Sequence, residues 1–380
     1  MRSGWWWFAN TVHGDGTETL AAADMPVSAP SVTTTLSGPD LIESTLTPEI
    51  ARLKAPDGRP VLRPRGTSMY AVLDGVIRAG GLVRSVSAEG HQAKIHCEGY
   101  VSYLDGLPWT SATTRKLYNT DPADVVRLIW AEAQSHPQGN LGLRVPAGLK
   151  TTARVGKFVA EVKNRAGEVT TQGVYEPVLL ANYATHDLGQ VFKEMLEAGS
   201  IDYREVHTLS GDTVTHDLVM GAPRLGRRRT DIQLMLGVNV TEVPSIMFDD
   251  EDFATEIAVF GAGEGPAMPR GFAQVQQQQS MVRKVQLITS KGIGRQATAQ
   301  TSAEIHAKQA RLDVGDVETV RVHPHPLAPL GSWENGDELW LSGDALWAGT
   351  IGMWVRVLST TWEPGTRPGA TLRVVRAERT

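Results

Sequence analysis

Two pairs of histidines are the closest approach in this sequence to a metal site. They are His323 with His325, separated by Pro324, and His91 with His96. Residues two apart in a strand share a face, so His323 and His325 are spaced to bind one metal ion together. Neither pair has a third ligand at a recognisable spacing. We therefore predict that these histidines belong to proline-containing loops and that they form no metal site.

Two glycine-rich segments are the candidates for phosphate binding. Gly261-Ala262-Gly263-Glu264-Gly265 lacks the third glycine of a dinucleotide loop and places Glu264 where a pyrophosphate would approach. Lys291-Gly292-Ile293-Gly294 lacks the order of a P-loop. Both segments are more typical of tight turns that need positive φ, so we predict no cofactor site.

Covalent catalysis has one candidate nucleophile, Cys97, which is the only cysteine. It lies beside His96 in a predicted strand, where neighbouring side chains point to opposite faces, so we predict a buried structural thiol. Two Thr-His-Asp-Leu segments, at 185 and 215, fall in a predicted helix start and a predicted strand, and we interpret the repetition as chance. A pair of carboxylates brought together through space stays open. No catalytic residue is predicted.

Charged runs are the next candidates for binding. Asp249-Asp250-Glu251-Asp252 lacks the glycine and alternating ligands of a calcium loop and favours a solvated turn. The densest basic segment is Pro223-Arg224-Leu225-Gly226-Arg227-Arg228-Arg229. It favours a solvated turn or an intersubunit salt bridge, and the alternative is contact with passing DNA phosphates. Whether Arg227 to Arg229 face such DNA stays open.

Tryptophan is concentrated near the C-terminus. The chain has 10 tryptophans, and five lie in its last fifty residues: Trp333, Trp340, Trp347, Trp354 and Trp362. Tryptophan combines a large apolar area with a polar tip, which suits cores, subunit interfaces and sugar-binding faces. We favour core or interface use, with carbohydrate binding as the alternative.

Composition limits the class of protein. The chain has 380 residues with 37 basic and 42 acidic side chains, a net charge of -5, and lacks the basic excess of a dedicated nucleic-acid binder. A single cysteine excludes an intramolecular disulfide and CxxC zinc sites. The densest apolar run, Trp5 to Ala9, is too short for a membrane span or for the core of a signal peptide. Packing must therefore hold two to four globular domains together.

The elements that must position any site are mainly strands. Residues 26–55 are rich in Ser, Thr and Pro and predict strands and turns that lead into a domain without forming its core. Residues 60–104 alternate β-branched residues with glycine breaks and predict an antiparallel sheet or small barrel. Short strands also follow from the patterns at residues 206–220, 232–243, 256–260, 338–341, 354–362 and 371–375.

Three helices are predicted. One covers 121–135, with Asp121 or Thr120 as the cap and a stop at 136–139. Another covers 187–198, with apolar residues at helical spacing and Gly199 as its stop. The third covers 301–312, where Thr301 and Glu304 form a possible capping box.

Two segments have a similar local pattern. Val83-Arg84-Ser85-Val86-Ser87 precedes a predicted strand at 93–96, and Val355-Arg356-Val357-Leu358-Ser359 precedes one at 370–374. A duplicated barrel would explain the similarity, although strand sequences also converge on Val and Thr. On these residues alone both explanations stay open.

Several segments in a fixed order resemble the minor tail proteins of long-tailed bacteriophages that infect actinobacteria. They are PVSAPSVTTTLSGPDLIESTLTPE at 26–49, DPADVVRLIWAEAQSHPQGNLGL at 121–143, GAPRLGRRRTDIQLMLGVN at 221–239, VFGAGEG at 259–265, and the end of the chain from His323, with GDELWL and VRVLSTTWEPG. The resemblance is to the group that supplies the hub of the tail tip or baseplate.

The resemblance implies a mainly β fold with α+β parts, in which two similar antiparallel β-barrel hub domains accompany smaller α/β domains. We expect the N-terminal segment and first β-barrel hub domain at 1–107. An α/β hub domain follows at 108–245, with the helices near 121–135 and 187–198. The second β-barrel hub domain is expected at 246–380, with the helix near 301–312.

The resemblance also implies a non-enzymatic, virion-associated function without cofactors. Three copies of a two-barrel chain present six similar barrels, so a homotrimer would match the sixfold ring of the distal tail protein. The tape measure protein and DNA would pass through the bore without specific binding, and tip or fibre proteins would attach below. We expect assembly from protein made in the host cytoplasm, without membrane insertion.

One departure and two rivals accompany this hypothesis. Some hubs continue into a peptidoglycan-cleaving or receptor-binding domain, whereas this chain ends at Thr380 after its last predicted strands, so lytic activity is expected from another chain. The rivals are a glycan-cleaving tail enzyme and a carbohydrate-binding tail module. The apolar segment Trp5 to Phe8 suggests docking onto a neighbour, so deletion of residues 1–9 is expected to impair assembly while leaving thermal unfolding nearly unchanged.

Overall fold

The protein is mainly β, with large antiparallel sheets and few helices, as the sequence predicts. The computed structural model describes residues 4–158, 162–163, 169–171, 175–184, 186–242, 244–248, 254–263, 265–275, 282–290, 293, 296–309, 315–346, 349–365 and 368–377. In these ranges no helix has the length and apolar character needed to cross a membrane.

The chain divides into two compact units, and each is made of separate segments. Unit 1 contains Met1–Arg228, Pro329–Asp337 and Leu358–Thr371. Unit 2 contains Arg229–Ala328, Glu338–Val357 and Leu372–Thr380. The chain passes from unit 1 to unit 2 within the basic segment that the sequence singled out.

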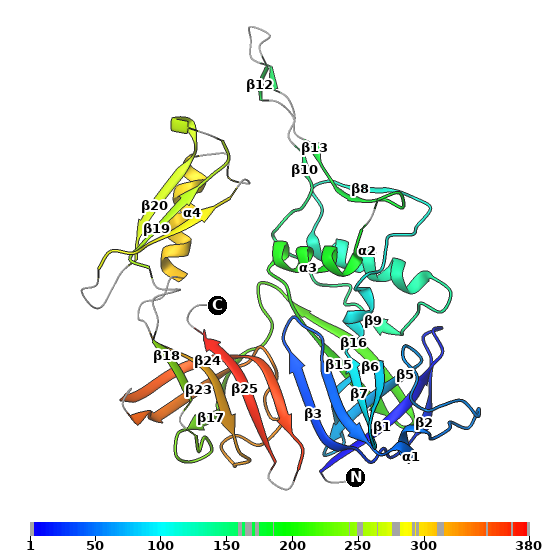
Figure 1. Ribbon diagram of the computed structural model, residues 1–380. Coiled ribbons are helices and arrows are strands. Elements are labelled where there is room, and N and C mark those ends of the chain that lie inside the picture. The colour runs from blue at the N-terminus through cyan, green and yellow to red at the C-terminus, as the bar shows by residue number, and fades with distance from the viewer. Residues whose placement is uncertain are drawn as a thin grey trace. The chain divides into compact units, whose positions relative to one another are not determined.

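An antiparallel sheet is the main element of unit 1 (Figure 1). The last residues of β24, Thr350–Glu363, belong to this unit and pair with β3. From there the strands follow the order β24-β3-β4-β7-β6-β5-β1-β2. The bounds are β1 Trp5–Val12, β2 Glu18–Ala22, β3 Ser28–Thr35, β4 Leu41–Leu46, β5 Thr67–Leu73, β6 Val76–Glu89 and β7 Gln92–Glu98.

The N-terminal strands of unit 1 correct two predictions. Strands β3 and β4 belong to the middle of the sheet, and Val32 and Ile42 are buried in the core, so residues 26–55 do more than lead into the domain. Strand β1 pairs with β5 over seven residues, and Trp7 and Phe8 are buried. The burial of Trp7, Phe8 and Ala9 argues against the expectation that deletion of residues 1–9 leaves thermal unfolding nearly unchanged.

The remainder of unit 1 packs helices against a second sheet. Helices α2, Pro122–Ser135, and α3, Leu188–Gly199, lie side by side and share a large apolar core (Figure 1). The second sheet has the order β15-β16-β9. The other elements are α1 Pro48–Ala51, the short 3₁₀ helix η1 Tyr100–Leu104, β8 Arg115–Leu117, β9 Leu143–Arg144, β10 Lys157–Phe158, β11 Val162–Lys163, β12 Val169–Thr171, β13 Tyr175–Glu176, β14 Val178–Leu180, β15 Asp202–Ser210 and β16 Thr213–Gly221.

The first two predicted helices are confirmed, with one correction at a terminus. The Asp121 side chain caps α2 and Pro122 is its first residue, as the sequence indicates. The residue that ends α3 in the left-handed conformation is Ser200, with φ of 49°, whereas Gly199 is still helical. Gly199 has a packing role, because a Cβ there would lie 3.1 Å from Pro122 Cβ of α2 and 2.8 Å from Ile201 Cδ1.

Unit 2 also contains an antiparallel sheet and a smaller α+β part (Figure 1). Its strands are β17 Arg228–Met235, which starts at the last residue of unit 1, β18 Ser245–Phe248, β22 Gly315–Val322, β23 Glu338–Asp344, the first residues of β24, and the last residues of β25 Gly369–Arg376. The smaller part has strand order β20-β19-β21, with bounds β19 Glu256–Phe260, η2 Gly265–Ala267, β20 Arg270–Gln274, β21 Val285–Thr289 and α4 Gln296–Gln309.

Helix α4 begins earlier than the sequence predicts. It starts at Gln296, so Thr301 lies inside the helix and does not cap it, and residues 310–312 fall outside the described part of the chain. The reason lies in a neighbouring strand. The side-chain amides of Gln296 and Gln300 each exchange two hydrogen bonds with the backbone of β20, at Arg270 and Phe272. These bonds pair the edge of the sheet with the first turns of the helix.

The two similar pentapeptides occupy similar elements. Val83–Ser87 lies in β6 and Val355–Ser359 lies in β24, and both strands have 14 residues. Strand β6 is adjacent to β7 in the sheet order, and β24 is adjacent to β25. The correspondence supports an internal duplication as a hypothesis, since similar long strands are followed by similar partners.

Candidate functional site

The hairpin β15-β16 places polar side chains where a core would be expected. Alternation along β15 buries Tyr203, Glu205 and His207, and alternation along β16 buries His216. His207 and His216 are direct partners in the register of the two strands. The sequence analysis missed this cluster. The signal was present as period-two alternation with polar residues on the inward face.

The two histidines bond to each other. His207 Nδ1 lies 2.9 Å from His216 Nδ1, so one ring donates and the other accepts. Burial and the neighbouring His216 lower the pKa of His207 to about 3. Burial also lowers the pKa of His216, although Glu18 opposes the shift. Both rings are therefore neutral near pH 7, so one Nδ1 carries a proton to donate and the other can accept it.

Glu18 lies at one end of this polar cluster. His216 Nε2 is 3.6 Å from Glu18 Oε1. Four side chains from three other elements donate to the same carboxylate: Asn10, Ser68, Tyr70 and Tyr100. Burial raises the pKa of Tyr70 and of Tyr100 well above the usual value, so both phenols keep the proton that they donate. A buried carboxylate with several donors is well compensated for its lost hydration.

Glu205 lies at the other end. Its Oε2 accepts a hydrogen bond of 2.6 Å from the Tyr100 amide, and its Oε1 accepts one of 3.0 Å from the Val101 amide, so it caps η1 from a distant strand. Burial raises the pKa of Glu205 to about 7 against these two bonds. Burial and the proximity of Glu205 raise the pKa of Asp40 well above its usual range.

Asp40 and Glu205 are the through-space carboxylates that the sequence left open. Both oxygens of Glu205 accept backbone amides, and Asp40 Oδ1 accepts the Thr35 amide. The two Glu205 bonds tie β15 to η1, and the Asp40 bond stabilises the β3-β4 connection.

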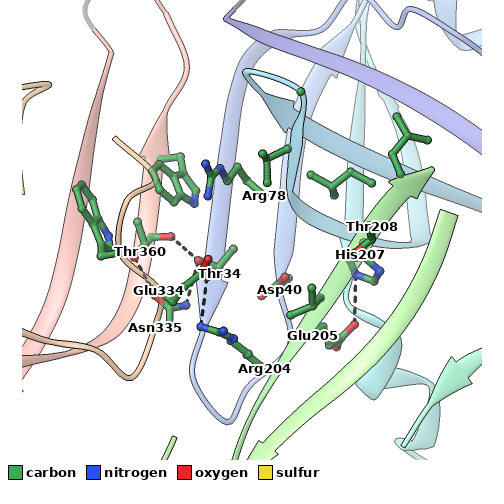
Figure 2. A pocket seen from close by; sticks show the side chains of 17 residues that line it. Thr34, Asp40, Arg78, Arg204, Glu205, His207, Thr208, Glu334, Asn335 and Thr360 are labelled. Atoms are coloured by element: carbon green, nitrogen blue, oxygen red, sulfur yellow. Dashed lines mark hydrogen bonds and ion pairs between the residues drawn. The ribbon is translucent and has the colours of Figure 1, made fainter. Parts of the chain in front are cut away.

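A cavity of about 250 Å³ lies beside this cluster within unit 1 (Figure 2). It is lined from β3, β6, β15, the 333–335 segment and β24. The lining residues are Thr34, Asp40, Gly75, Val76, Ile77, Arg78, Arg204, Glu205, Val206, His207, Thr208, Leu209, Trp333, Glu334, Asn335, Thr360 and Trp362. The cavity is formed by segments that lie far apart in the sequence, so no local sequence motif predicts it.

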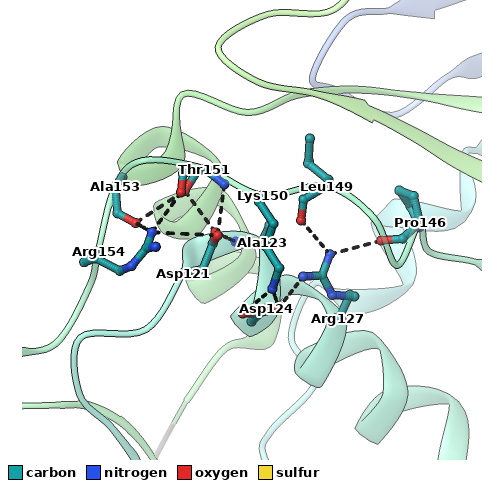
Figure 3. Close-up of polar contacts among 10 residues, drawn as sticks. All are labelled: Asp121, Ala123, Asp124, Arg127, Pro146, Leu149, Lys150, Thr151, Ala153 and Arg154. Atoms are coloured by element: carbon teal, nitrogen blue, oxygen red, sulfur yellow. Dashed lines mark hydrogen bonds and ion pairs between the residues drawn. The ribbon is translucent and has the colours of Figure 1, made fainter.

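Asp121 makes a second polar cluster at the start of α2 (Figure 3). Its Oδ1 accepts from the Ala123 amide and the Thr151 hydroxyl, each at 2.9 Å, and its Oδ2 accepts from the Thr151 amide at 2.9 Å. One buried carboxylate therefore caps the helix and fixes the segment that contains Thr151. Arg154 adds an ion-pair contact at 3.8 Å.

Asp121→Ala is expected to destabilise the protein by about 2 kcal/mol or more, because a helix cap is lost and the Thr151 amide loses its acceptor. Urea unfolding measures the effect. Asp124→Ala is the matched control, because Asp124 forms surface ion pairs with Arg127 and Lys150 and should cost about 1 kcal/mol or less. Equal losses for the two variants would contradict the assigned role of Asp121.

The residues singled out in the sequence do not converge. Cys97 is buried, as predicted, and its pKa is raised by burial, while His96 bonds to Glu43 and Glu98. His325 Nδ1 accepts the Leu327 amide in the loop that follows β22. In the described ranges no three His, Cys, Asp or Glu side chains gather as metal ligands.

The glycine-rich and charged motifs are only partly described. Gly263 and Gly265 have positive φ, which confirms a tight turn there. Lys291, Gly292 and Gly294 of the second glycine segment, and the acidic run 249–252, lie outside the described residues. In the basic segment, the Arg227 amide donates to Asp337 Oδ1, and Arg229 forms an ion pair with Asp231.

Two of the C-terminal tryptophans belong to the core of unit 1. The rings of Trp333 and Trp362 stack at 6.0 Å, and both side chains are buried. Trp340 and Trp354 form a cross-strand pair between β23 and β24 in unit 2. Trp347 lies outside the described residues. Core packing therefore accounts for Trp333 and Trp362, as we favoured.

No protein-family model matches the sequence, and no curated protein matches it. Solved structures of similar fold do exist. A 43 kDa tail protein of a prophage from Shewanella oneidensis has a TM-score of 0.58 at 11% identity, covering 92% of this chain and 94% of that one. A tail protein from Neisseria meningitidis has a TM-score of 0.57 at 14% identity, and the match covers 98% of this chain and 97% of that one. A prophage tail protein from Listeria monocytogenes has a TM-score of 0.54 at 11% identity, and the match covers 98% of this chain and 95% of that one. The chain is therefore similar in fold, almost from end to end, to phage tail proteins.

Proposed function

We propose that this chain is a structural hub of the tail tip, or baseplate, of a long-tailed phage. The observation that carries the proposal is the fold similarity to tail proteins over at least 92% of this chain and 94% of theirs. A match that includes both units supports a whole-protein role, since a shared single domain would leave the rest of the chain unexplained.

The proposed mechanism is symmetry adaptation. Two similar β-rich hub domains per chain, in a homotrimer, present six similar surfaces to the sixfold ring of the distal tail protein. Tip or fibre proteins attach on the opposite side, and the tape measure protein and then DNA pass through the bore. The net charge of -5 fits a passage that releases DNA, because a basic bore would retain it. The sequence resemblance supports a phage of actinobacteria.

The polar clusters support a structural function over the enzymatic rival. Glu205 and Asp40 are engaged by backbone amides, and Glu18 is engaged by four side chains. Such hydrogen-bond networks hold elements in one arrangement. The rings of Trp333 and Trp362 stack on each other and are largely buried, which is typical of core packing. These features support a structural role, in which the chain holds its partners in a fixed arrangement.

Light scattering after size exclusion, across a concentration series, tests the proposal. We expect a molar mass near three times 41.2 kDa for the chain alone, or an increase of that size over the mass of the distal tail ring when the ring protein is added. Ring proteins can need such a partner, because closure stabilises interfaces that are individually weak. A monomer that persists in the presence of the ring protein would contradict the hub, and turnover of cell-wall polysaccharide would favour the enzyme.

A further inference from the structure

The cavity of unit 1 has an excess of hydrogen-bond donors. In the described part of the chain, five buried nitrogens of its lining side chains have no hydrogen-bond partner: His207 Nε2 and four nitrogens of arginine and tryptophan, Arg78 Nε, Arg204 Nε, Trp333 Nε1 and Trp362 Nε1. Guanidinium and indole groups only donate. Because most buried polar groups in folded proteins are satisfied, four such donors around one cavity indicate an occupant that accepts hydrogen bonds.

The charge of the lining indicates an anion. Arg204 Nη1 lies 3.3 Å from Glu334 Oε2, so this arginine is balanced by a carboxylate (Figure 2). Arg78 donates from Nη1 to the Gly331 carbonyl at 3.1 Å and stacks over Trp362 at 5.7 Å. Glu334 and Asp74 act on Arg78 only through space, and burial lowers its pKa. A guanidinium stays charged even so.

Burial opposes negative charge on the two other acids of the lining. It raises the pKa of Glu205 to about 7, so this carboxyl group is mostly protonated at pH 6, and it raises the pKa of Asp40 well above its usual range. His207 is neutral at this pH. Two arginines therefore face one carboxylate, Glu334, that burial does not penalise in this way, and this favours a singly charged anion.

We propose that this cavity binds a carboxylate, held by Arg78 and Arg204, with the rest of the ligand against Trp333 and Trp362. A planar carboxylate fits the fork of a guanidinium group, and the indole N–H groups supply further donors. The lining also includes apolar side chains of Ile77 and Leu209, which accommodate an uncharged portion. Its size, equal to about eight water molecules at roughly 30 Å³ each, admits a small organic acid or one acidic side chain.

The proposal is independent of the oligomeric state and is tested on the full chain at pH 6. Ligand-observed saturation-transfer NMR measures the affinity for sodium glucuronate, with glucose as the uncharged counterpart. We expect saturable glucuronate binding that is at least about tenfold tighter than that of glucose, the size of one charge-assisted contact. A capped Ala-Ala-Asp-Ala-Ala peptide and its Asn counterpart test whether the carboxylate comes from a partner chain.

Variants of the lining test the assignment of residues. Arg78→Met should weaken binding at least about tenfold, whereas Arg59→Met, the same change at an exposed arginine outside the cavity, should leave it unchanged. Glu334→Gln removes the competing carboxylate and should tighten binding. Glu334→Gln still tests the assignment if Arg78→Met does not fold. The thermal unfolding midpoint of Arg78→Met shows whether that variant folds.

Three results would overturn the proposal. These are binding of glucose as tight as that of glucuronate, saturation by neither carboxylate probe, and unchanged affinity in both Arg78→Met and Glu334→Gln. Water alone would then satisfy the unpartnered nitrogens. Binding of the aspartyl peptide without glucuronate would support the proposal and assign the carboxylate to an acidic side chain of a partner.

Discussion

Phe8→Ala is expected to lower the free energy of unfolding by about 3 to 5 kcal/mol, the range for removing a buried aromatic side chain. Phe8 is 3% exposed on β1 and stacks on Tyr70 with ring centroids 4.8 Å apart. The two residues are also register partners between β1 and β5. The loss would include the cavity left in the cluster with Val72 and Val214, where β1 meets the β15-β16 hairpin. Urea unfolding followed by circular dichroism measures it.

Leu20→Ala is the control for Phe8→Ala. Leu20 lies on the neighbouring strand β2 and is 45% exposed, so its truncation should change stability by about 0.5 kcal/mol or less. A similar small effect at Phe8 would mean that β1 is peripheral, as the apolar N-terminus by itself suggested. The large effect would mean instead that any assembly defect on deleting residues 1–9 reports unfolding of unit 1.

The cost of Glu205→Gln is expected to depend strongly on pH. The pKa of Glu205 is about 7 in the folded protein against 4.5 for an ordinary glutamate. Between these values the unfolded chain has released the proton and the folded chain keeps it, so the contribution of Glu205 to stability falls as pH rises. At 1.36 kcal/mol per pKa unit, wild type should lose about 3 kcal/mol relative to Glu205→Gln between pH 4.5 and pH 8.

At low pH, Glu205→Gln is expected to be less stable than wild type. Glutamine offers one acceptor oxygen where Glu205 accepts from both the Tyr100 and Val101 amides, so Glu205→Gln should be less stable than wild type by about 1 to 3 kcal/mol at pH 4.5. The difference should close or reverse by pH 8. Glu197→Gln, at an exposed position of α3, should follow wild type throughout. A cost of Glu205→Gln that stays constant with pH would contradict the prediction.

The contribution of His207 to the free energy of unfolding changes with pH in the direction opposite to that of Glu205. Its pKa is about 3 in the folded protein against 6.5 ordinarily, so between these values only the unfolded chain takes up the proton, and stability falls as pH falls. Between pH 4.5 and pH 6.5 the loss of stability from Glu205 and the gain from His207 offset each other as pH rises. The wild-type profile therefore contains both contributions, and because His207 Nε2 lies 3.7 Å from Glu205 Oε2, Glu205→Gln changes the surroundings of His207 as well.

Local signals in the sequence determined the elements that are held by local interactions. Asp121 and Pro122 specify the start of α2, because a cap and its helix are adjacent in the chain. The apolar spacing of residues 187–198 specifies α3 for the same reason, and the strand pattern predicted at 206–220 falls within the hairpin of β15 and β16. These patterns also indicated a mainly β chain, which the structure confirms.

Tertiary structure decided everything that depends on a distant partner. Helix α4 begins at Gln296 because that side chain bonds to Arg270 of β20, and Gly199 is glycine because α2 packs against it. Glu205 caps η1 from 105 residues away, and β1 becomes a core strand because β5, some sixty residues later, pairs with it.

The candidate site belongs entirely to this second category. Residues of β3, β6, β15, the 333–335 segment and β24 line the cavity, although more than three hundred positions separate Thr34 from Trp362. By itself the sequence determined that Glu205 and His207 share one face of a strand and that His216 shares a face with Val214 and Leu218. Only the folded chain decides that Glu205, His207 and His216 are buried together beside two arginines, because hydrogen bonding and desolvation depend on neighbours in space.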